Sequence, residues 1–199
     1  MSQESPTEHL EHIEHAEHAA HSGDSFLVRV SATIAILAVV AATVDSFETI
    51  ETAATINAKN DAVLLQNKAT DTWNFFQAKS VKKNMYSIAA AATPTPAAAD
   101  AFKKDAARNA ADEKELGEKG KSLEEQTEAK LHESESHEHR HHRLTLSVTL
   151  LHIGIAIATL AIIVRGARWP FYMAIGLGIA GVIVAIMAYI PGLAHLIHV

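Results

Sequence analysis

The sequence predicts an all-α membrane protein with three transmembrane helices and a long antiparallel, coiled-coil-like helical hairpin inserted between the first and the second. Two observations lead to this fold class. The apolar residues of the 199-residue chain gather in three blocks, at residues 26–44, 144–164 and 171–190. Each block is close to the ~20 residues with which a helix crosses the hydrocarbon of a bilayer. In addition, residues 24–93 contain no glycine and no proline, so nothing ends the first helix where it leaves the membrane.

The amino-terminal residues 1–25 form an acidic tail rich in histidine and glutamate, and its six acidic groups equal the net charge of -6 of the whole chain. The tail has no Lys or Arg, whereas a secretory signal peptide begins with basic residues. We therefore expect the first apolar block to remain as a membrane anchor. The only charged residue of that block, Arg29, lies one turn from its start, where a long side chain can reach the lipid headgroups.

Residues 45–143 are predicted to form the hairpin outside the membrane. Apolar positions recur at helical spacing through residues 45–92, and the Thr-Pro-Thr-Pro sequence at 93–96 then makes a turn. The return arm, residues 97–143, is rich in Ala, Glu and Lys. The arms contain 48 and 47 residues, about 70 Å each at a helical rise of roughly 1.5 Å. The chain is therefore expected to return to the membrane surface that it left.

Two features of the return arm leave alternatives open. Gly117 and Gly120 interrupt its helical composition, and we expect them to kink or loosen the helix. The stretch EKELGEKGKSLEEQTEAK has few large apolar residues, which is also typical of a disordered linker. Pairs of Glu and Lys at helical spacing, such as Glu115 with Lys119, favour the helix.

Three spans place the amino-terminal tail and the carboxyl-terminal tail, residues 191–199, on opposite faces of the membrane. Basic residues near the spans include Arg29, Arg165 and Arg168 on the amino-terminal side. This count favours a cytoplasmic amino tail and a hairpin outside the cytoplasm. Two arginines that precede the second span on the hairpin side argue for the opposite orientation.

Histidines gather at three places in the sequence, and we interpret them as candidate metal ligands. In the tail, EHLEHIEHAEHAAH places a histidine at every third residue. This period drifts by about 60° per repeat on an α-helix, so one helix presents only two or three imidazoles together. Such a set binds zinc, nickel or copper weakly, and the alternatives are a pH-responsive tail or a plain solvated amphipathic segment. The candidate ligands are His9, His12, His15, His18, His21, His137, His139, His141, His142, His195 and His198.

Two sets of residues are predicted to lie at interfaces between chains. Small residues line one face of the third block, which is the pattern by which helices pack closely in lipid. Three aromatic residues of the hairpin exceed what two helices bury between them, with a place in the hairpin core as the alternative. The predicted interface residues are Trp73, Phe75, Phe76, Ala174, Gly178, Gly181 and Ala185.

His152, with Arg29, is an ionisable residue at membrane depth. Such residues are candidates for a functional role. A hydrogen bond to a nearby hydroxyl, such as that of Thr149, is the alternative for His152.

The segment DSFETIETAATINAKNDAVLLQNKATDTWNFFQAKSVKKNMY, residues 45–86, carries a resemblance to a known family. With the His/Glu tail and the three spans, it resembles a bacterial three-span membrane-protein family catalogued only as a domain of unknown function. The residues that carry the resemblance are AAT-I-AKN-AVLLQ-KA and W-F-QAKS-KK. The resemblance implies a helical middle region between membrane spans, and it implies no activity, cofactor or catalytic residue.

The predicted function follows from this architecture. We expect no enzyme, because a thin two-helix hairpin has no interior in which polar groups converge, and no nucleic-acid binding, because no basic stripe is free of acids. The sequence favours an oligomeric inner-membrane scaffold or accessory subunit that presents helical hairpins for self-association or for a larger membrane complex. The alternatives are a small oligomeric channel or transporter and a His-rich metal-binding membrane protein. Membrane lipid and further copies of the chain are the expected partners, and no cofactor is certain.

Overall fold

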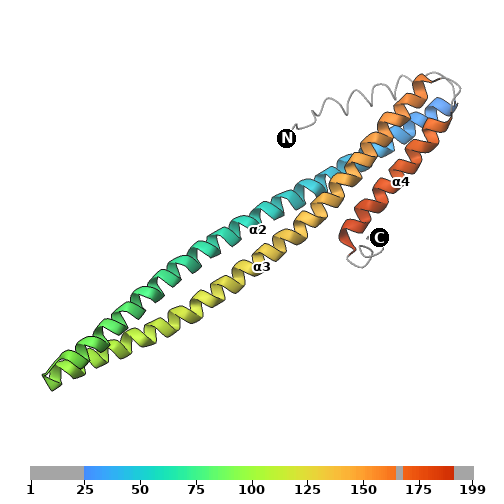
Figure 1. Cartoon of the computed structure of the whole chain (residues 1–199). Helices are drawn as coiled ribbons and strands as arrows, with labels where there is room; N and C mark the ends of the chain where they lie inside the picture. Colours follow the sequence, from blue (N-terminus) through green and yellow to red (C-terminus); the bar gives the residue numbers. More distant parts are fainter. Residues whose placement is uncertain (1–24, 165–167, 191–199) are drawn as a thin grey trace. The chain divides into compact units, whose positions relative to one another are not determined.

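The computed structural model describes residues 25–164 and 168–190, and within these ranges the chain is helical and contains no strand (Figure 1). The helices are α2 (Ser25–Ala92, 68 residues), α3 (Pro96–Ile163, 68 residues) and α4 (Trp169–Tyr189, 21 residues). The predicted all-α class is therefore confirmed. All three helices have the length and the apolar composition to cross a membrane, which is compatible with a membrane location.

The described residues fall into two compact units. The three-helix unit contains the described residues up to Ala54 and those from Ser136 onward, and the hairpin unit contains Thr55–Glu135. Parts of α2 and α3 pack together with α4 in the three-helix unit, whereas the hairpin unit consists of α2, a turn and α3.

The turn between α2 and α3 has only three residues, Thr93–Thr95. Both threonines precede a proline, and a following proline disfavours helical backbone. Pro96 is the first residue of α3, a position where the missing N–H costs nothing and the fixed φ suits a helix. The carbonyl of Thr95 accepts the N–H of Ala99 at 3.0 Å, so the return helix begins directly after the turn.

The facing surfaces of α2 and α3 in the hairpin unit, here called the seam, are lined by short side chains. Ala58, Ala62 and Ala69 of α2 are 0–4% exposed, and their spacing of four and seven places them on one helix face. Short side chains let two helix backbones approach closely. Buried polar side chains of the seam each donate a hydrogen bond to a main-chain carbonyl; they are Thr72, Asn109, Thr127 and Ser134.

Two glycines of α3 face two aromatic side chains of α2 across the seam. A Cβ atom on Gly120 would lie 2.8 Å from the ring of Trp73, and one on Gly117 would lie 3.2 Å from the ring of Phe76. The two rings meet edge to face with centroids 5.2 Å apart. The glycines do not interrupt α3, which is helical through both positions. Their lack of a side chain leaves the space that the two rings fill.

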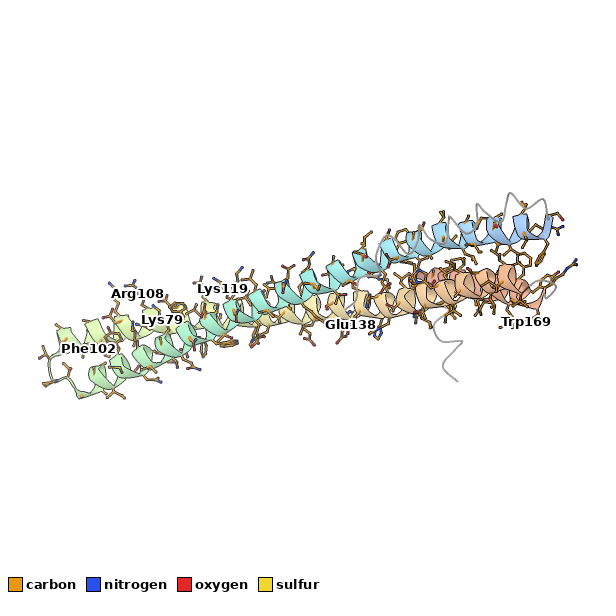
Figure 2. The ribbon with its side chains drawn as sticks, turned by 90° about the horizontal axis from the view of Figure 1, so that it is seen from above. Lys79, Phe102, Arg108, Lys119, Glu138 and Trp169 are labelled. Carbon is orange, nitrogen blue, oxygen red and sulfur yellow. The ribbon has the colours of Figure 1, made fainter. Side chains whose placement is uncertain are left out.

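Ring and charge contacts further along the seam fix the same antiparallel register. Tyr86 and Phe102 stack with ring centroids 6.2 Å apart, and Figure 2 shows Phe102 near the turn. The ammonium group of Lys79, also labelled there, donates to a carboxylate oxygen of Asp112 at 2.7 Å. Both pairs join α2 to α3, so the two helices are tied together by groups of different chemistry.

The three-helix unit has an apolar core in which α3 and α4 approach closely. The hydroxyl of Ser147 donates to the carbonyl of Gly181 at 2.7 Å, and a Cβ on Gly181 would lie 2.9 Å from the side chain of Leu151. A side chain at this position of α4 would therefore separate the two helices. The largest fully buried apolar side chains of α2 and α3 are Val30, Ile34, Leu144 and Leu151.

Gly120→Leu should destabilise the protein, because the new side chain would overlap the ring of Trp73. Overpacking of this kind costs about 1–3 kcal/mol. The measurement is thermal unfolding of the full chain in detergent, followed by circular dichroism and tryptophan fluorescence. Gly176→Leu is the matched control, because a Cβ there would meet nothing within 4 Å. An equal loss of stability in both variants would contradict the proposed role of Gly120.

Candidate functional site

A buried carboxylate in the three-helix unit connects all three helices. Glu51 of α2 is 6% exposed, and its Oε2 atom lies 2.6 Å from Nδ1 of His137 and 3.2 Å from Nε of Arg140, both on α3. The hydroxyl of Tyr189, the last residue of α4, also bonds to this carboxylate. We name Glu51, His137, Arg140 and Tyr189 the Glu51 cluster.

The geometry fixes which nitrogen of His137 carries a proton. A carboxylate can only accept a hydrogen bond, so the 2.6 Å contact to Glu51 requires Nδ1–H on the ring. An NH2 group of Arg140 lies 3.1 Å from the same nitrogen. Because the guanidinium can only donate, this second approach is a contact rather than a hydrogen bond.

The pKa of the Glu51 carboxyl reflects two opposing influences. Burial is the largest and raises the pKa, because it disfavours the charged form. Hydrogen bonds from His137 and Tyr189 and the positive charge of Arg140 act in the opposite direction. Together they hold the pKa below the 4.5 of an unperturbed Glu carboxyl, so Glu51 is a carboxylate at neutral pH.

A second carboxylate lies one helical turn earlier on α2. Glu48 accepts a hydrogen bond from the hydroxyl of Thr145 at 2.7 Å and lies 3.6 Å from Nδ1 of His141. The same nitrogen of His141 is 3.0 Å from the hydroxyl oxygen of Thr52. Because that hydroxyl donates to the carbonyl of Glu48, its oxygen accepts from His141. Two layers of polar contacts therefore join α2 to α3.

Arg143 joins α3 to α4 by a hydrogen bond to a main-chain carbonyl. One NH1 group donates to the carbonyl of Met187 at 2.9 Å. The last carbonyls of a helix have no partner within it, and a cation at this end also suits the helix dipole. Arg143 therefore satisfies a carbonyl in the last turn of α4.

The predicted metal ligands are only partly within the described residues. His137 bonds to Glu51, whereas His141 bonds to Thr52 and lies 3.6 Å from Glu48; His139 and His142 are exposed. Residues 25–164 and 168–190 contain no group of three or more His, Cys, Asp or Glu side chains arranged to hold a metal ion. The tail histidines and His195 and His198 lie outside these ranges.

The predicted interface residues lie in different surroundings. Trp73 and Phe76 pack in the seam of the hairpin unit, whereas Phe75 is 62% exposed. Of the small residues of α4, Ala174, Gly178 and Gly181 are buried within the chain itself and Ala185 packs at the edge of the core.

The two ionisable residues that are predicted to lie at membrane depth also differ. Arg29 is exposed, and its carbonyl accepts a hydrogen bond from the hydroxyl of Thr33. His152 is half-buried on α3.

Sequence reasoning did not single out Glu48, Glu51 or Tyr189. A signal was present, because the two glutamates lie one turn apart just after the first apolar block. His137 and His141, whose rings lie 2.6 Å and 3.6 Å from these carboxylates, lie just before the second block. Combined with arms of equal length, this placement predicts that the two sets meet when the chain turns back.

Glu51→Gln should lower the stability of the protein at neutral pH, since a hydrogen bond to a charged group contributes about 1.5–3 kcal/mol. A carboxyl whose pKa is lowered by folding stabilises the protein above pH 4.5, the value of the unperturbed group. That contribution is lost as the pH falls through the folded-state pKa. The difference in melting temperature between the wild type and Glu51→Gln should therefore shrink as the pH falls below that value. Glu118→Gln is the control, because Glu118 is exposed and should show no such difference; a constant difference at every pH would contradict the assignment.

Comparison with known proteins gives one match. A family sequence model described as Domain of unknown function (DUF4337) matches residues 26–191. The search of curated proteins and the search of solved structures each found no match. The matched residues include all of α3 and α4 and all but the first residue of α2. The chain therefore belongs to the DUF4337 family.

Proposed function

We propose that the protein is a membrane-inserted helical scaffold whose copies associate through one face of the hairpin unit. The observation that supports this function is a set of large apolar side chains on α2 that are 53–69% exposed. They lie on the part of α2 that the sequence predicts to stand outside the membrane. We name this set the outer α2 face; it consists of Ile56, Val63, Leu64, Val81, Met85 and Ile88.

These residues lie on one side of α2, in two groups. Ile56 and Val63 are seven residues apart, as are Val81 and Ile88, and a separation of two turns places side chains on the same side of a helix. Between the two groups, this side carries exposed polar residues, which are Asn67, Thr70 and Asn74. Ala62 and Ala69, which are also seven apart, are buried in the seam. In the hairpin unit, α2 therefore buries one apolar side against α3 and leaves two apolar groups exposed on the other side.

The outer side of α3 in the hairpin unit is charged instead. Figure 2 shows Arg108 and Lys119 projecting from it, and among the described residues Leu131 is the one large apolar side chain that is exposed there. Ion pairs such as Lys83 with Glu113 join the two helices beside the seam. The exposed charged residues of this side are Lys103, Lys104, Arg108, Lys114, Glu115, Glu118, Lys119, Lys121, Glu125 and Glu128.

This difference between the two sides favours a second copy of the chain as the partner of the outer α2 face. Apolar surface gains about 25 cal/mol for each Å² removed from water, and contiguous apolar patches on proteins mark interaction sites. Two identical faces can meet in a symmetric dimer, where the outer α2 face of each copy covers that of the other. The lysines and acids of α3 would then stay in water. A different membrane protein with an apolar helix would use the same face, which corresponds to an accessory subunit.

We further propose the bacterial inner membrane as the location, with the hairpin unit in the periplasm. The basic residues on the amino-terminal side of the spans support this orientation. Because the chain has no cysteine, one introduced cysteine reports a single position. Lys104→Cys, at an exposed position of α3, should react with a membrane-impermeant maleimide on spheroplasts, and Ser5→Cys in the tail should react only after the membrane is disrupted. The reverse result would place the hairpin unit in the cytoplasm.

The double variant Val81→Lys and Ile88→Lys should dissociate the oligomer. A symmetric dimer buries each of these two side chains twice, so the variant removes four apolar side chains that contribute roughly 1.5 kcal/mol each. The dissociation constant should therefore rise on the order of 10,000-fold. The measurement is the mass of the full chain in detergent, by light scattering or native mass spectrometry.

A matched control places two lysines on the charged side of the same unit, at Ala107 and Ala111, which are exposed on α3. This variant should keep the mass of the wild type. A monomeric wild type, or a Val81→Lys and Ile88→Lys variant with unchanged mass, would overturn self-association through the outer α2 face.

A further inference from the structure

We propose that a groove between α2 and α4 binds an acyl chain of one anionic phospholipid, whose phosphate is bound by Arg143. The inference concerns the three-helix unit and goes beyond self-association of the hairpin unit. It rests on the proposed insertion of the three helices in a membrane. Its basis is an apolar groove that ends at the depth of an arginine with unused hydrogen-bond donors.

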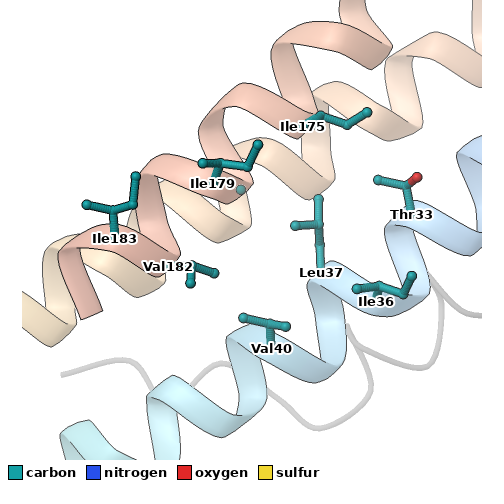
Figure 3. Close-up of a pocket in the computed structure, with 9 residues that line it drawn as sticks. Thr33, Ile36, Leu37, Val40, Ile175, Ile179, Val182 and Ile183 are labelled. Carbon is teal, nitrogen blue, oxygen red and sulfur yellow. The ribbon is translucent and has the colours of Figure 1, made fainter. Parts of the chain in front are cut away.

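Two adjoining hollows on the surface of the three-helix unit form the groove. Their volumes are about 300 Å³ and 440 Å³, within the range of about 300–1,000 Å³ that is usual for ligand sites. Val40 of α2 and Val182 of α4 line both hollows, so the two are continuous. Figure 3 shows Leu37 and Val40 of α2 on one side of the first hollow and Ile179 and Val182 of α4 on the other.

The lining of the groove is almost entirely hydrocarbon. Its two polar side chains are Thr33 and Tyr189, and both hydroxyls are engaged. That of Thr33 donates to the carbonyl of Arg29 at 2.9 Å, and that of Tyr189 bonds to Glu51. The groove therefore offers a ligand apolar contacts only, which suits an acyl chain.

The second hollow ends at the depth of Arg143 along the helices. Leu144, which lines it, follows Arg143 directly on α3, and Tyr189 lines it from the last turn of α4. Arg143 bonds to the carbonyl of Met187, in the same last turn. Phe47 and Tyr189 meet edge to face at this end with ring centroids 6.3 Å apart. A lipid with its chain in the groove would thus have its headgroup at the depth of the guanidinium of Arg143.

Arg143 differs from Arg140 in having no carboxylate partner among the described residues. A guanidinium has five N–H groups, and the described contacts of Arg143 use one of them, for Met187. Arg140 is paired with Glu51, and Glu48 accepts from Thr145, so both nearby carboxylates are already bonded. Arginine binds phosphate through two parallel hydrogen bonds, and basic groups between membrane helices bind anionic headgroups.

The test compares two lipids on the purified, delipidated full chain by native mass spectrometry. Phosphatidylglycerol has two acyl chains and a phosphate, and diacylglycerol has the same chains without the phosphate. The wild type should bind one phosphatidylglycerol per chain, at least about tenfold more tightly than diacylglycerol. Arg143→Gln should remove this preference and leave diacylglycerol binding unchanged.

Filling the groove should remove binding of both lipids. Val40→Trp fills it from α2 and Val182→Trp fills it from α4, so one variant serves if the other does not fold. Ile153→Trp is the matched control, because Ile153 is exposed on α3 and lines neither hollow. Circular dichroism without lipid shows that each variant is folded before binding is compared.

The outcomes distinguish a phospholipid in the groove from a second copy of the chain and from lipid bound elsewhere. Phosphatidylglycerol binding that survives both groove-filling variants would place the lipid elsewhere and overturn the proposal. The proposal would also be overturned if a groove-filling variant lowered only the mass of the assembly, because a second copy of the chain would then occupy the groove. A chain that partitions into membranes but binds no phosphatidylglycerol would refute the lipid site alone, whereas a chain that stays in solution without detergent would refute the proposed membrane insertion as well.

Discussion

The antiparallel register of α2 against α3 is the constraint on which the other contacts depend. Because the turn has only three residues, each residue of α3 can face only a short stretch of α2. This register places Gly120 against Trp73 in the hairpin unit and His137 against Glu51 in the three-helix unit. A shift of one residue rotates every side chain by about 100°. It would bring a lysine, Lys119 or Lys121, to the place of the glycine and would separate the buried carboxylate from its partners.

Glu51 makes the arrangement of the three helices specific as well as stable. A buried charge is costly unless its partners are in place, and those of Glu51 come from both other helices, as His137 and Arg140 on α3 and Tyr189 on α4. Apolar contacts alone would tolerate several ways of packing three helices, since Leu, Ile and Val are interchangeable at many positions. The carboxylate is fully bonded only when both other helices are present in this register.

The fold class could be predicted because the features that determine it are local in the sequence. Uninterrupted apolar blocks and two prolines in four residues are visible without knowledge of any contact. The candidate site was not found this way, since Glu51 and His137 are 86 residues apart. Arms of equal length bring the two regions to the same level, but only the register decides which residues bond. Trp73 and Phe76 show the same limit. They were singled out as aromatic residues, but their partners in the seam are glycines, whose contribution is the absence of a side chain.

The short turn also has a consequence for the order of events during synthesis. Contacts between α2 and α3 are nested: Lys83 and Glu113 are 30 residues apart, whereas Glu48 and Thr145 are 97 residues apart. Each closed contact shortens the loop that the next one must close, so pairing proceeds from the turn outward. At about 5–20 residues per second, roughly 5–20 s separate the synthesis of Glu48 from that of Thr145. The apolar first part of α2 therefore exists for seconds before its partner on α3 has been made, and over that interval the face that α3 later buries has no contact with it.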